Sequence, residues 1–527
     1  MIIERSVSTM TVEQLSSRTY ERRWWTLGVL CVSLVMIVVA NASLNVALPT
    51  LVKDLHASAS SLQWIVDAYS LVFAGLLLTA GSLGDRYGRR LALNSGLIIF
   101  GVASGLAAFA GSSGQLIAAR AVMGIGAALV MPATLSVLAH VFPPEERKAA
   151  IAIWAGFAGV GAALGGVTSG WLLEHFWWGS IFLTNVAVVV VALIAGAILI
   201  PKANEDEEPA LDLIGALLSI AGLGSLVYAI IEAPTRGWLS GPTLVSFGVA
   251  VVVLLAFAWW ELRTLEPMLD LRFFRNPQFA AAASSITFVF FVMFGMIFTM
   301  TQYLQLVLGY SPLEAGVRML PWAVVYMISA RRSARFVERF GQRLVVSWGL
   351  TVVAAGLALL ALSGLHSNYA LLALSLMVSA AGMGMVTAPS TGAIIVSLPL
   401  NKAGVGSAVN DTTRELGGAL GVAVLGSLIA SLYRADLPTS AHAASTSLGA
   451  GLQAAAALPS PAGAQLAYAA RAAYVHAFDI TMLVAVGVAL VAALVISRVL
   501  RPRTDGEVVL AADAYVEYNE SLTLVSN

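Results

Sequence analysis

The ten residues Gly81-Ser-Leu-Gly-Asp85-Arg-Tyr-Gly-Arg-Arg90 interrupt a chain that is otherwise rich in apolar residues. A weaker copy of this stretch, Ala334-Arg-Phe-Val-Glu338-Arg-Phe-Gly-Gln-Arg343, returns about 253 residues later. Each copy follows the second apolar segment in a group of six. A charged turn that is repeated at this spacing between membrane spans predicts two halves of six helices, built on one plan.

The composition places the chain in a lipid bilayer. It is 59% hydrophobic and 11% charged, with a mean hydropathy of +0.85, which leaves too few ionisable residues to cover a soluble globule of 527 residues. The single cysteine, Cys31, lies in the first apolar segment, which excludes an intrachain disulfide and a thiol metal site. The six scattered histidines form no ligand cluster or catalytic triad, so we expect neither an enzyme nor a bound metal or cofactor. Nucleic acid is not an expected partner.

Fourteen apolar stretches are long enough to cross a hydrocarbon core of ~30 Å as helices. They are expected near residues 24–48, 61–83, 91–110, 114–139, 148–173, 179–200, 212–232, 241–262, 279–306, 314–333, 344–364, 369–397, 404–432 and 475–498. Of the 29 Lys and Arg residues, five fall in outer segments and two within spans if both tails are cytoplasmic. This asymmetry predicts cytoplasmic termini by the positive-inside rule.

The expected fold class is an all-α polytopic membrane protein with two six-helix bundles and two inserted helices. The halves cover residues 24–200 and 278–498, and the second contains an outer loop at 435–474 that is expected to be flexible or loosely helical. Residues 201–277 hold the insertion, which we expect to be peripheral because its helices carry no strong polar motif in their centres. Cytoplasmic tails are expected at 1–23 and 499–527.

Several short blocks occur in an order that is typical of one family. They are Asn45-Val-Ala-Leu-Pro49, Trp64-Ile-Val-Asp67-Ala-Tyr69, Gly81 to Arg90, Arg120 to Ala128, Gly161 to Gly166, and Asn410-Asp-Thr-Thr-Arg-Glu-Leu-Gly-Gly418. With these blocks the chain resembles the major facilitator superfamily, in its group of fourteen-helix drug:proton antiporters of the methylenomycin and quaternary-ammonium resistance type. The resemblance implies a bacterial inner-membrane, multi-pass exporter of small amphipathic molecules with protons as the second partner, working as a monomer.

Three positions depart from the family pattern. An acidic residue of the first span is replaced by Ala40, a proline of the fifth span by Ala162, and a glutamine of the fourth span by Met123. Because the first two changes bear on coupling, an uncoupled facilitator or metabolite exporter of the same fold stays open as an alternative. A membrane sensor that transports nothing is a third hypothesis. The chain has no nucleotide-binding pattern of the Gly-x-x-x-x-Gly-Lys-Ser/Thr type, so ATP is not the expected energy source.

Ionisable residues inside spans are the candidates for proton coupling and substrate contact, because burying a charge in lipid is costly. Asp67 shares a helical stripe with Trp64 and can carry a proton or hold a cation, or else form a structural hydrogen bond. Arg120 faces a partner or wet cavity, or else extends to the outer interface. In the thirteenth span, Arg414 lies three residues after Asp411, and Glu415 four, which predicts a titratable group or a simple ion pair.

Two glycine-rich segments are candidates for conformational roles. The turn with Gly81, Asp85, Arg86, Gly88, Arg89 and Arg90 is expected to act as a latch between helices, or only as a basic cluster that sets orientation. Gly161, Gly165 and Gly166 predict a close helix contact that can pivot. A cavity lining is expected from Asn41, Asn45, Trp64, Tyr69, Met296, Met300, Gln302 and Tyr303.

Overall fold

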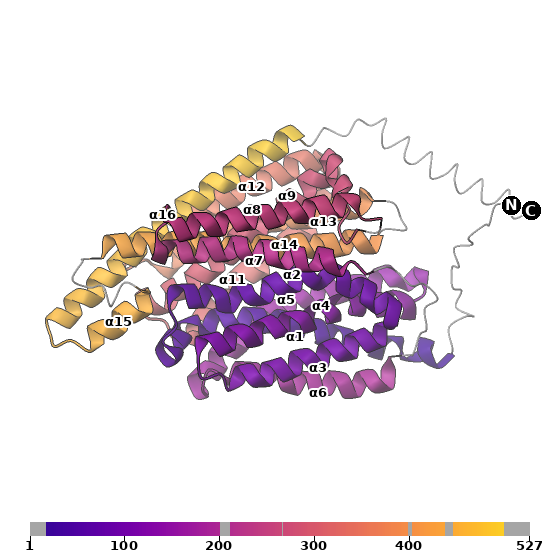
Figure 1. Cartoon of the computed structure of the whole chain (residues 1–527), viewed down its shortest axis with the longest axis horizontal. Helices are drawn as coiled ribbons and strands as arrows, with labels where there is room; N and C mark the ends of the chain where they lie inside the picture. Colours follow the sequence, from indigo (N-terminus) through magenta and orange to yellow (C-terminus); the bar gives the residue numbers. More distant parts are fainter. Residues whose placement is uncertain (1–16, 201–210, 266, 399–402, 438–445, 500–527) are drawn as a thin grey trace, which may run out of the picture.

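The computed structural model describes residues 17–200, 211–265, 267–398, 403–437 and 446–499, and within these ranges every regular element is a helix. The long helices run side by side along one direction (Figure 1). No strand occurs among the described residues. The expectation of an all-α fold is therefore confirmed.

The first group of helices packs around its own apolar core. It comprises α1 (Ser17–Leu55), α2 (Ala59–Tyr87), α3 (Arg89–Ala108), α4 (Ser113–Val141), α5 (Pro144–His175) and α6 (Ser180–Leu199). Serine side chains set two of the starts, because Ser58 and Ser112 accept hydrogen bonds from the backbone N–H groups of Ser61 and Gln115. Apart from Phe298 and Val422, the buried residues of this core lie between Leu27 and Ile200.

The second group has a separate core. Its helices are α9 (Pro277–Gln302), α10 (Pro312–Arg318), α11 (Leu320–Phe340), α12 (Gln342–Leu360), α13 (Tyr369–Val396), α14 (Ala403–Asp436), α15 (Leu448–Ala456) and α16 (Ala462–Val499), with short η2 (Leu271–Arg275) before α9 and η3 (Tyr303–Val307) after it. Apart from Leu78, its buried apolar residues lie between Phe279 and Ile496. The helices thus pack around two separate cores, one in each half of the chain. That each half holds six membrane spans stays a prediction.

The two charged turns share one backbone feature. Gly88 separates α2 from α3 with φ of 100°, and Gly341 separates α11 from α12 with φ of 78°. Both angles lie in the region that favours glycine, so any other residue would be strained there. Because the glycines hold equivalent positions in the two copies, the repeat in sequence is also a repeat in structure.

Within the described ranges, thirteen helices are long and apolar enough to cross a membrane, compared with the fourteen spans expected. The missing one is the expected span 314–333, which the structure divides into α10 and α11 at Met319. Pro321 lies in the first turn of α11, where its missing N–H costs least, and α11 carries arginines through its last three turns. These charges lower its hydropathy, although α11 packs beside α13 and α5 within the bundle.

The expected outer loop 435–474 is more ordered than its composition predicts. It contains α15, and α16 begins at Ala462, well before the expected span at 475–498. Figure 1 shows α15 and the start of α16 extending beyond the ends of the other helices. Residues 438–445 of this loop lie outside the described part.

The prediction that both inserted helices are peripheral is wrong for α7 (Leu213–Arg236). Val227, Ile230 and Ile231 of α7 form a buried cluster with Leu71 of α2 and with Ala419 and Ala423 of α14. In contrast, α8 (Gly241–Arg263) buries only Thr243, Ala250 and Glu261. The inserted hairpin therefore covers the seam between α2 and α14 with one helix and leaves the other exposed.

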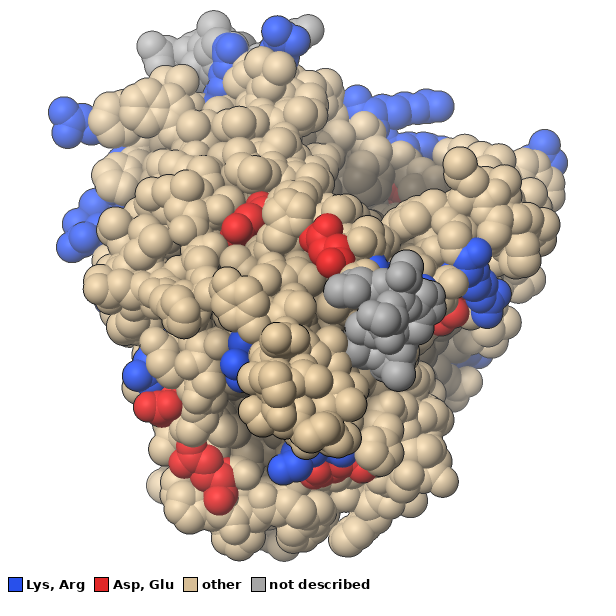
Figure 2. Space-filling view, turned by 90° about the vertical axis from the view of Figure 1, so that its left-hand side faces the viewer, with Lys and Arg blue, Asp and Glu red and all other residues tan. Residues whose placement is uncertain are grey.

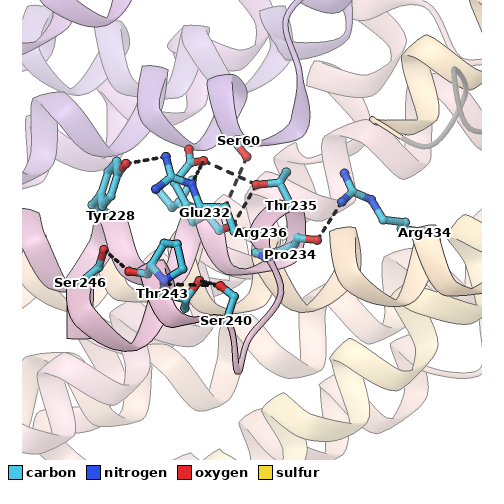
Figure 3. Close-up of polar contacts among 12 residues, drawn as sticks. Ser60, Tyr228, Glu232, Pro234, Thr235, Arg236, Ser240, Thr243, Ser246 and Arg434 are labelled. Atoms are coloured by element: carbon cyan, nitrogen blue, oxygen red, sulfur yellow. Dashed lines mark hydrogen bonds and ion pairs between the residues drawn. The ribbon is translucent and has the colours of Figure 1, made fainter. Parts of the chain in front are cut away.

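Polar contacts fasten the α7–α8 turn to both groups of helices (Figure 3). The Ser60 hydroxyl of α2 donates to the Ile231 carbonyl at 3.3 Å, and Arg434 of α14 donates to the Pro234 carbonyl at 2.8 Å. Just beyond α7, the Trp238 indole donates to the Ser431 hydroxyl at 3.1 Å. We call these three hydrogen bonds the hairpin clasp.

Candidate functional site

A cavity of about 1560 Å³ lies between the two groups of helices. Residues of α1, α2, α4 and α5 line it on one side, and residues of α9, α10, α11, α13 and α14 line it on the other. At one end the wall includes Gly81, Asp85 and Arg89 of the first charged turn. The space between the two cores is therefore accessible from the end of the molecule that carries this turn.

The opposite end is closed by contacts between the two groups. Gln305 donates to the Val46 carbonyl at 2.9 Å, and the Leu313 backbone N–H donates to the Glu174 carboxylate at 3.2 Å. Nearby, the Ser427 hydroxyl contacts the Gln63 amide oxygen at 3.3 Å. Figure 2 shows this end, on which α15 lies; its surface is mostly uncharged, with separated Lys, Arg, Asp and Glu side chains.

Three ionisable side chains of α14 lie on the cavity wall, namely Asp411, Arg414 and Glu415. The Arg414 guanidinium lies 3.5 Å from an Asp411 carboxylate oxygen and 4.7 Å from the centre of the Phe290 ring on α9. The Asn410 amide donates to the same Asp411 oxygen at 3.2 Å. Asp411 is thus neutralised by its neighbours, because a cation and an amide both face it.

Glu415 lies one turn further along α14 and is less well paired. One of its carboxylate oxygens is buried and has no hydrogen-bond partner among the described residues. The Ser70 hydroxyl of α2 lies near its carboxylate across the seam. Arg414 pairs with Asp411, whereas Glu415 has no ion-pair partner among the described residues.

Arg120 is fully buried, which contradicts the alternative that it extends to the outer interface. Its guanidinium donates to the Ile65 carbonyl at 3.1 Å and to the Asn41 amide oxygen at 2.9 Å, and it lies 4.3 Å from the centre of the Tyr69 ring. These partners replace part of the hydration that the charge loses on burial, while Nη1 has no hydrogen-bond partner among the described residues. Since Asn41 lines the cavity, Arg120 reaches the cavity through that side chain.

Asp67 is fully buried, and neither carboxylate oxygen has a hydrogen-bond partner among the described residues. It does not belong to the cavity wall. On α2 it lies one turn after Gln63, which contacts Ser427 of α14, and one turn before Leu71, which packs on Ala419 and Ala423 of α14. This spacing places Asp67 on the face of α2 that is turned toward the seam with α14. The alternative that Asp67 forms a structural hydrogen bond is therefore not supported, because its carboxylate has no partner in the described part.

The predicted cavity lining needs correction. Asn41 and Asn45 lie on the wall, whereas six other candidates do not: Trp64, Tyr69, Met296, Met300, Gln302 and Tyr303. Trp64 packs beside Tyr228 of α7, and Tyr303 stacks on Phe478 of α16. These side chains share helices with the lining but occupy faces that are turned toward neighbouring helices.

The face of α9 that does line the cavity consists of Phe290, Met293, Phe294, Ile297 and Thr301. Their spacing of three or four residues marks one helical stripe. This stripe cannot be selected from the sequence, because α9 is apolar on all sides and its hydrophobic pattern does not distinguish a cavity from a neighbouring helix. The polar stripe of α14 is the available signal, because α14 packs beside α9 and Arg414 contacts Phe290 of this stripe.

The first charged turn makes its contacts within the first group of helices. Arg89 lies 3.4 Å from Asp85 and donates to the Ser136 carbonyl of α4, and Arg90 donates to the Ala197 carbonyl of α6 at 2.8 Å. The turn is thereby anchored on both α4 and α6. A related contact at the same end joins Arg23 of α1 to Glu146 of α5 at 2.7 Å, and the hydrogen bond from Arg23 lowers the pKa of Glu146 below its ordinary value.

The glycines of α5 occupy close helix contacts. A Cβ at Gly165 would lie 2.7 Å from the Ala42 side chain of α1, and a Cβ at Gly161 would lie 3.2 Å from Val38. Gly166 faces Gly316 of α10, at the closed end of the cavity. Small residues here let α5 approach the first core on one side and the second core on the other.

A bundle of membrane-spanning helices, closed at one end and hollow between two cores, with ionisable groups on the wall, defines the class of solute transporters. The chain belongs to the major facilitator superfamily, because residues 30–422 match the model of that family, described as Major Facilitator Superfamily. It is therefore a multi-pass membrane transporter rather than an enzyme.

Relatives of similar length carry names that refer to drug resistance. The multidrug efflux pump LfrA of Mycolicibacterium smegmatis is 37% identical over 494 residues, which cover 92% of this chain and 98% of the relative. The methyl viologen resistance protein SmvA of Salmonella typhimurium is 35% identical over 475 residues, which cover 88% of this chain and 95% of the relative. The methylenomycin A resistance protein of Streptomyces coelicolor is 32% identical, covering 73% and 82%.

Solved structures with the same fold are more distant in sequence. A bacterial homologue of the human lysosomal transporter Spinster, in an inward-facing and occupied conformation, matches with a TM-score of 0.64 at 19% identity, over 92% of this chain and 97% of that one. The POT family transporter PepTSo matches with a TM-score of 0.62 at 14% identity, over 90% of this chain and 97% of that one. At these identities, the likeness concerns the fold alone.

Proposed function

We propose that this transporter exports small amphipathic drugs or toxic compounds from the cytoplasm in exchange for protons. The names of LfrA and SmvA support the substrate class, since they refer to multidrug efflux and to resistance against methyl viologen, an organic dication. The observation that carries the proposal is the presence of Asp411, Arg414 and Glu415 on the wall of a cavity whose opposite side is aromatic and aliphatic. Such a wall can hold an apolar body and a cationic group together.

The proposed topology has fourteen spans, with α11 as the span that hydropathy alone does not select. Residues 24–200 and 278–498 form two bundles, residues 201–277 form the insertion, and both termini are cytoplasmic. In this topology the Gly81–Arg90 turn lies in the cytoplasm, so the cavity is open to the inside. Substrate then enters from the side on which an exporter collects it.

In the proposed cycle, the substrate enters the inward-open cavity and displaces a proton from Glu415. The two bundles then rock so that the cavity opens outward, and a proton from outside restores Glu415 and releases the substrate. Each elementary charge that moves inward across 100 mV supplies about 2.3 kcal/mol. Asp67 is the second proposed proton carrier, because a buried carboxyl without a partner is held in its neutral form by lipid and protein.

Two segments are proposed to govern the rocking motion. The turn with Asp85 and Arg89 acts as the latch, since it borders the open end of the cavity and can exchange its contacts when that end closes. Gly161, Gly165 and Gly166 act as the pivot, because α5 touches both cores where the cavity is closed. Rigid helices can rotate about contacts of this kind without repacking their cores.

An uncoupled facilitator is the second candidate, and Ala40 is the observation that favours it. In place of the acidic residue of the family pattern, this alanine is buried in the first core and carries no proton. Transport in vesicles separates the two candidates. An antiporter accumulates substrate only while a pH gradient is maintained, whereas a facilitator equilibrates it after the gradient has been collapsed by an ionophore.

The proposed coupling is tested with inverted vesicles and a cationic dye. Glu415→Gln is expected to lower dye-dependent proton release at least tenfold, while Asp270→Asn removes another cavity-wall carboxylate as the matched control. Equal losses in both variants would mean that the charge of the cavity matters and that Glu415 has no special role.

A further inference from the structure

The last three turns of α11 expose four arginines, namely Arg331, Arg332, Arg335 and Arg339. Among the described residues, none of the four has an ion pair or a hydrogen bond, and Arg339 only lies 5.3 Å from the centre of the Phe340 ring. The first charged turn differs, since its Arg89 and Arg90 donate to carbonyls of α4 and α6. The arginines of α11 therefore keep their donors available for an external partner.

These arginines are regularly spaced along the helix. Arg331, Arg335 and Arg339 recur at intervals of four residues, so they form one stripe about 12 Å long. The neighbouring stripe contains Phe336 and Phe340, which are 38% and 52% exposed. α11 thus presents a row of guanidinium groups directly beside a row of exposed aromatic rings.

The apolar surface of the same helix places this end at the edge of the hydrocarbon. Val324 and Ile328 precede the arginine stripe on the same side of α11 and are 48% and 44% exposed. On the adjoining α12, Leu344 and Trp348 are also exposed, at 50% and 68%. In a protein that spans a bilayer, such surface faces acyl chains, and the arginines begin where it ends, at the level of the lipid headgroups.

We propose that this surface, Arg331 to Phe340 of α11, binds an anionic phospholipid. The lipid phosphate lies on the stripe of Arg331, Arg335 and Arg339, because guanidinium groups match phosphate oxygens in charge and in fork geometry. The glycerol and the first acyl carbons cover Phe336 and Phe340. The inference rests on the placement of the chain in a bilayer and does not depend on which solute is exported.

A lipid in this position contacts the outer side of a cavity wall. On the inner side of α11, Tyr326, Met327 and Ala330 line the cavity. Gly384 of α13 meets the backbone of Tyr326 and Ala330 so closely that no side chain fits between the two helices. The bound lipid therefore lies on the side of α11 that is turned away from both the cavity and α13.

The proposal is tested by native mass spectrometry of the full-length protein, released from detergent with phosphatidylglycerol or phosphatidylcholine. The wild type is expected to retain phosphatidylglycerol preferentially. Each arginine near an anionic lipid is worth about fivefold in affinity, so the triple variant R331Q/R335Q/R339Q should lose the preference by a factor on the order of a hundred. R263Q/R275Q/R498Q removes the same charge from other exposed arginines and is expected to keep the preference.

Two further variants keep the test valid if the triple variant folds poorly. Glu338→Gln removes the single acid of the cluster and is expected to tighten phosphatidylglycerol retention up to about fivefold. R331K/R335K/R339K preserves charge but loses the guanidinium forks, so it should fall between wild type and the glutamine variant. The proposal is overturned if the control triple loses as much preference, if phosphatidylcholine is held as tightly, or if inorganic phosphate displaces the lipid.

Discussion

Gly316 of α10 faces Gly166 of α5 so closely that a Cβ added at residue 316 would collide with the Gly166 carbonyl oxygen. This contact joins the two groups of helices at the closed end of the cavity. Next to it, the Leu313 backbone donates to Glu174 of α5 at 3.2 Å. The closed end is therefore sealed by backbone against backbone, which side chains at these two positions would prevent.

Gly316→Ala is expected to open this end, because overpacking a tight contact costs about 1–3 kcal/mol. If the cavity alternates between its two ends, the open end must then close. A cysteine placed at Ala408 on the cavity wall should react with a maleimide from the side of the Gly81–Arg90 turn about tenfold more slowly than in the parent. The native Cys31 is buried and is the sole cysteine of the sequence, so it adds little background.

The control for this experiment is Gly364→Ala, because a Cβ there would meet nothing within 4 Å. It should leave the labelling rate unchanged. Unchanged labelling in Gly316→Ala as well would mean that α5 and α10 adapt locally and that their contact does not control the cavity.

The contribution of Arg120 to stability and export is expected to depend on Asn41, since the Arg120 guanidinium donates to the Asn41 amide oxygen at 2.9 Å. Arg120→Lys and Asn41→Ala should each lower the melting temperature and the rate of dye export. The double variant should be little worse than the more severe single one, because both changes remove the same interaction. Melting curves and export rates of the four proteins form the cycle, and additive losses would show that the two residues act separately.

Asp67 should tolerate an amide. A buried carboxyl without partners is far more stable protonated than ionised, and asparagine copies the size of the protonated form. Asp67→Asn is thus expected to keep the melting temperature within a few degrees of the wild type and to lower substrate-dependent proton release severalfold. Intact proton release would refute a coupling role for Asp67, whereas a large loss of stability would contradict its neutral state.

The repeated turn was sufficient to predict two helix–turn–helix segments of the same form within an all-helical membrane protein. It works because a charged, glycine-containing turn between long apolar segments has few structural solutions in a membrane, and because Gly88 and Gly341 must adopt the same backbone form. The acids of α14 were also accessible from sequence, since a carboxylate in a span is rarely left without a role.

Which helix faces meet the cavity could not be predicted in the same way. Met296 and Met293 lie on one helix and have the same chemistry, yet only Met293 lines the cavity. Their difference depends on the rotation of α9 against α13 and α14, which is set by packing and not by local sequence. The position of α7 over the α2–α14 seam was missed for a related reason, because a uniformly apolar helix gives no sign of whether it faces lipid or protein.

The hairpin clasp leads to the last prediction. Arg434 and Ser431 belong to α14, whereas Ser60 belongs to α2, so the end of the α7–α8 hairpin is bonded to one helix from each group at the closed end. Figure 3 shows the bonds of Ser60 and Arg434. R434Q with Trp238→Phe removes the two bonds to α14 and keeps the bulk of both side chains. A hydrogen bond from a charged donor contributes about 1.5–3 kcal/mol and one from a neutral donor about 0.5–1.5 kcal/mol. Backbone amides at the end of α14 should therefore exchange with deuterium at least tenfold faster, while the end of the hairpin stays bonded to α2 only.

Ser246→Ala, which removes a hydroxyl that donates to the Pro242 carbonyl within α8, is the matched control and should leave the exchange of α14 unchanged. If α14 exchanges at the wild-type rate in the double variant, then the apolar contacts of α7 alone hold the hairpin in place.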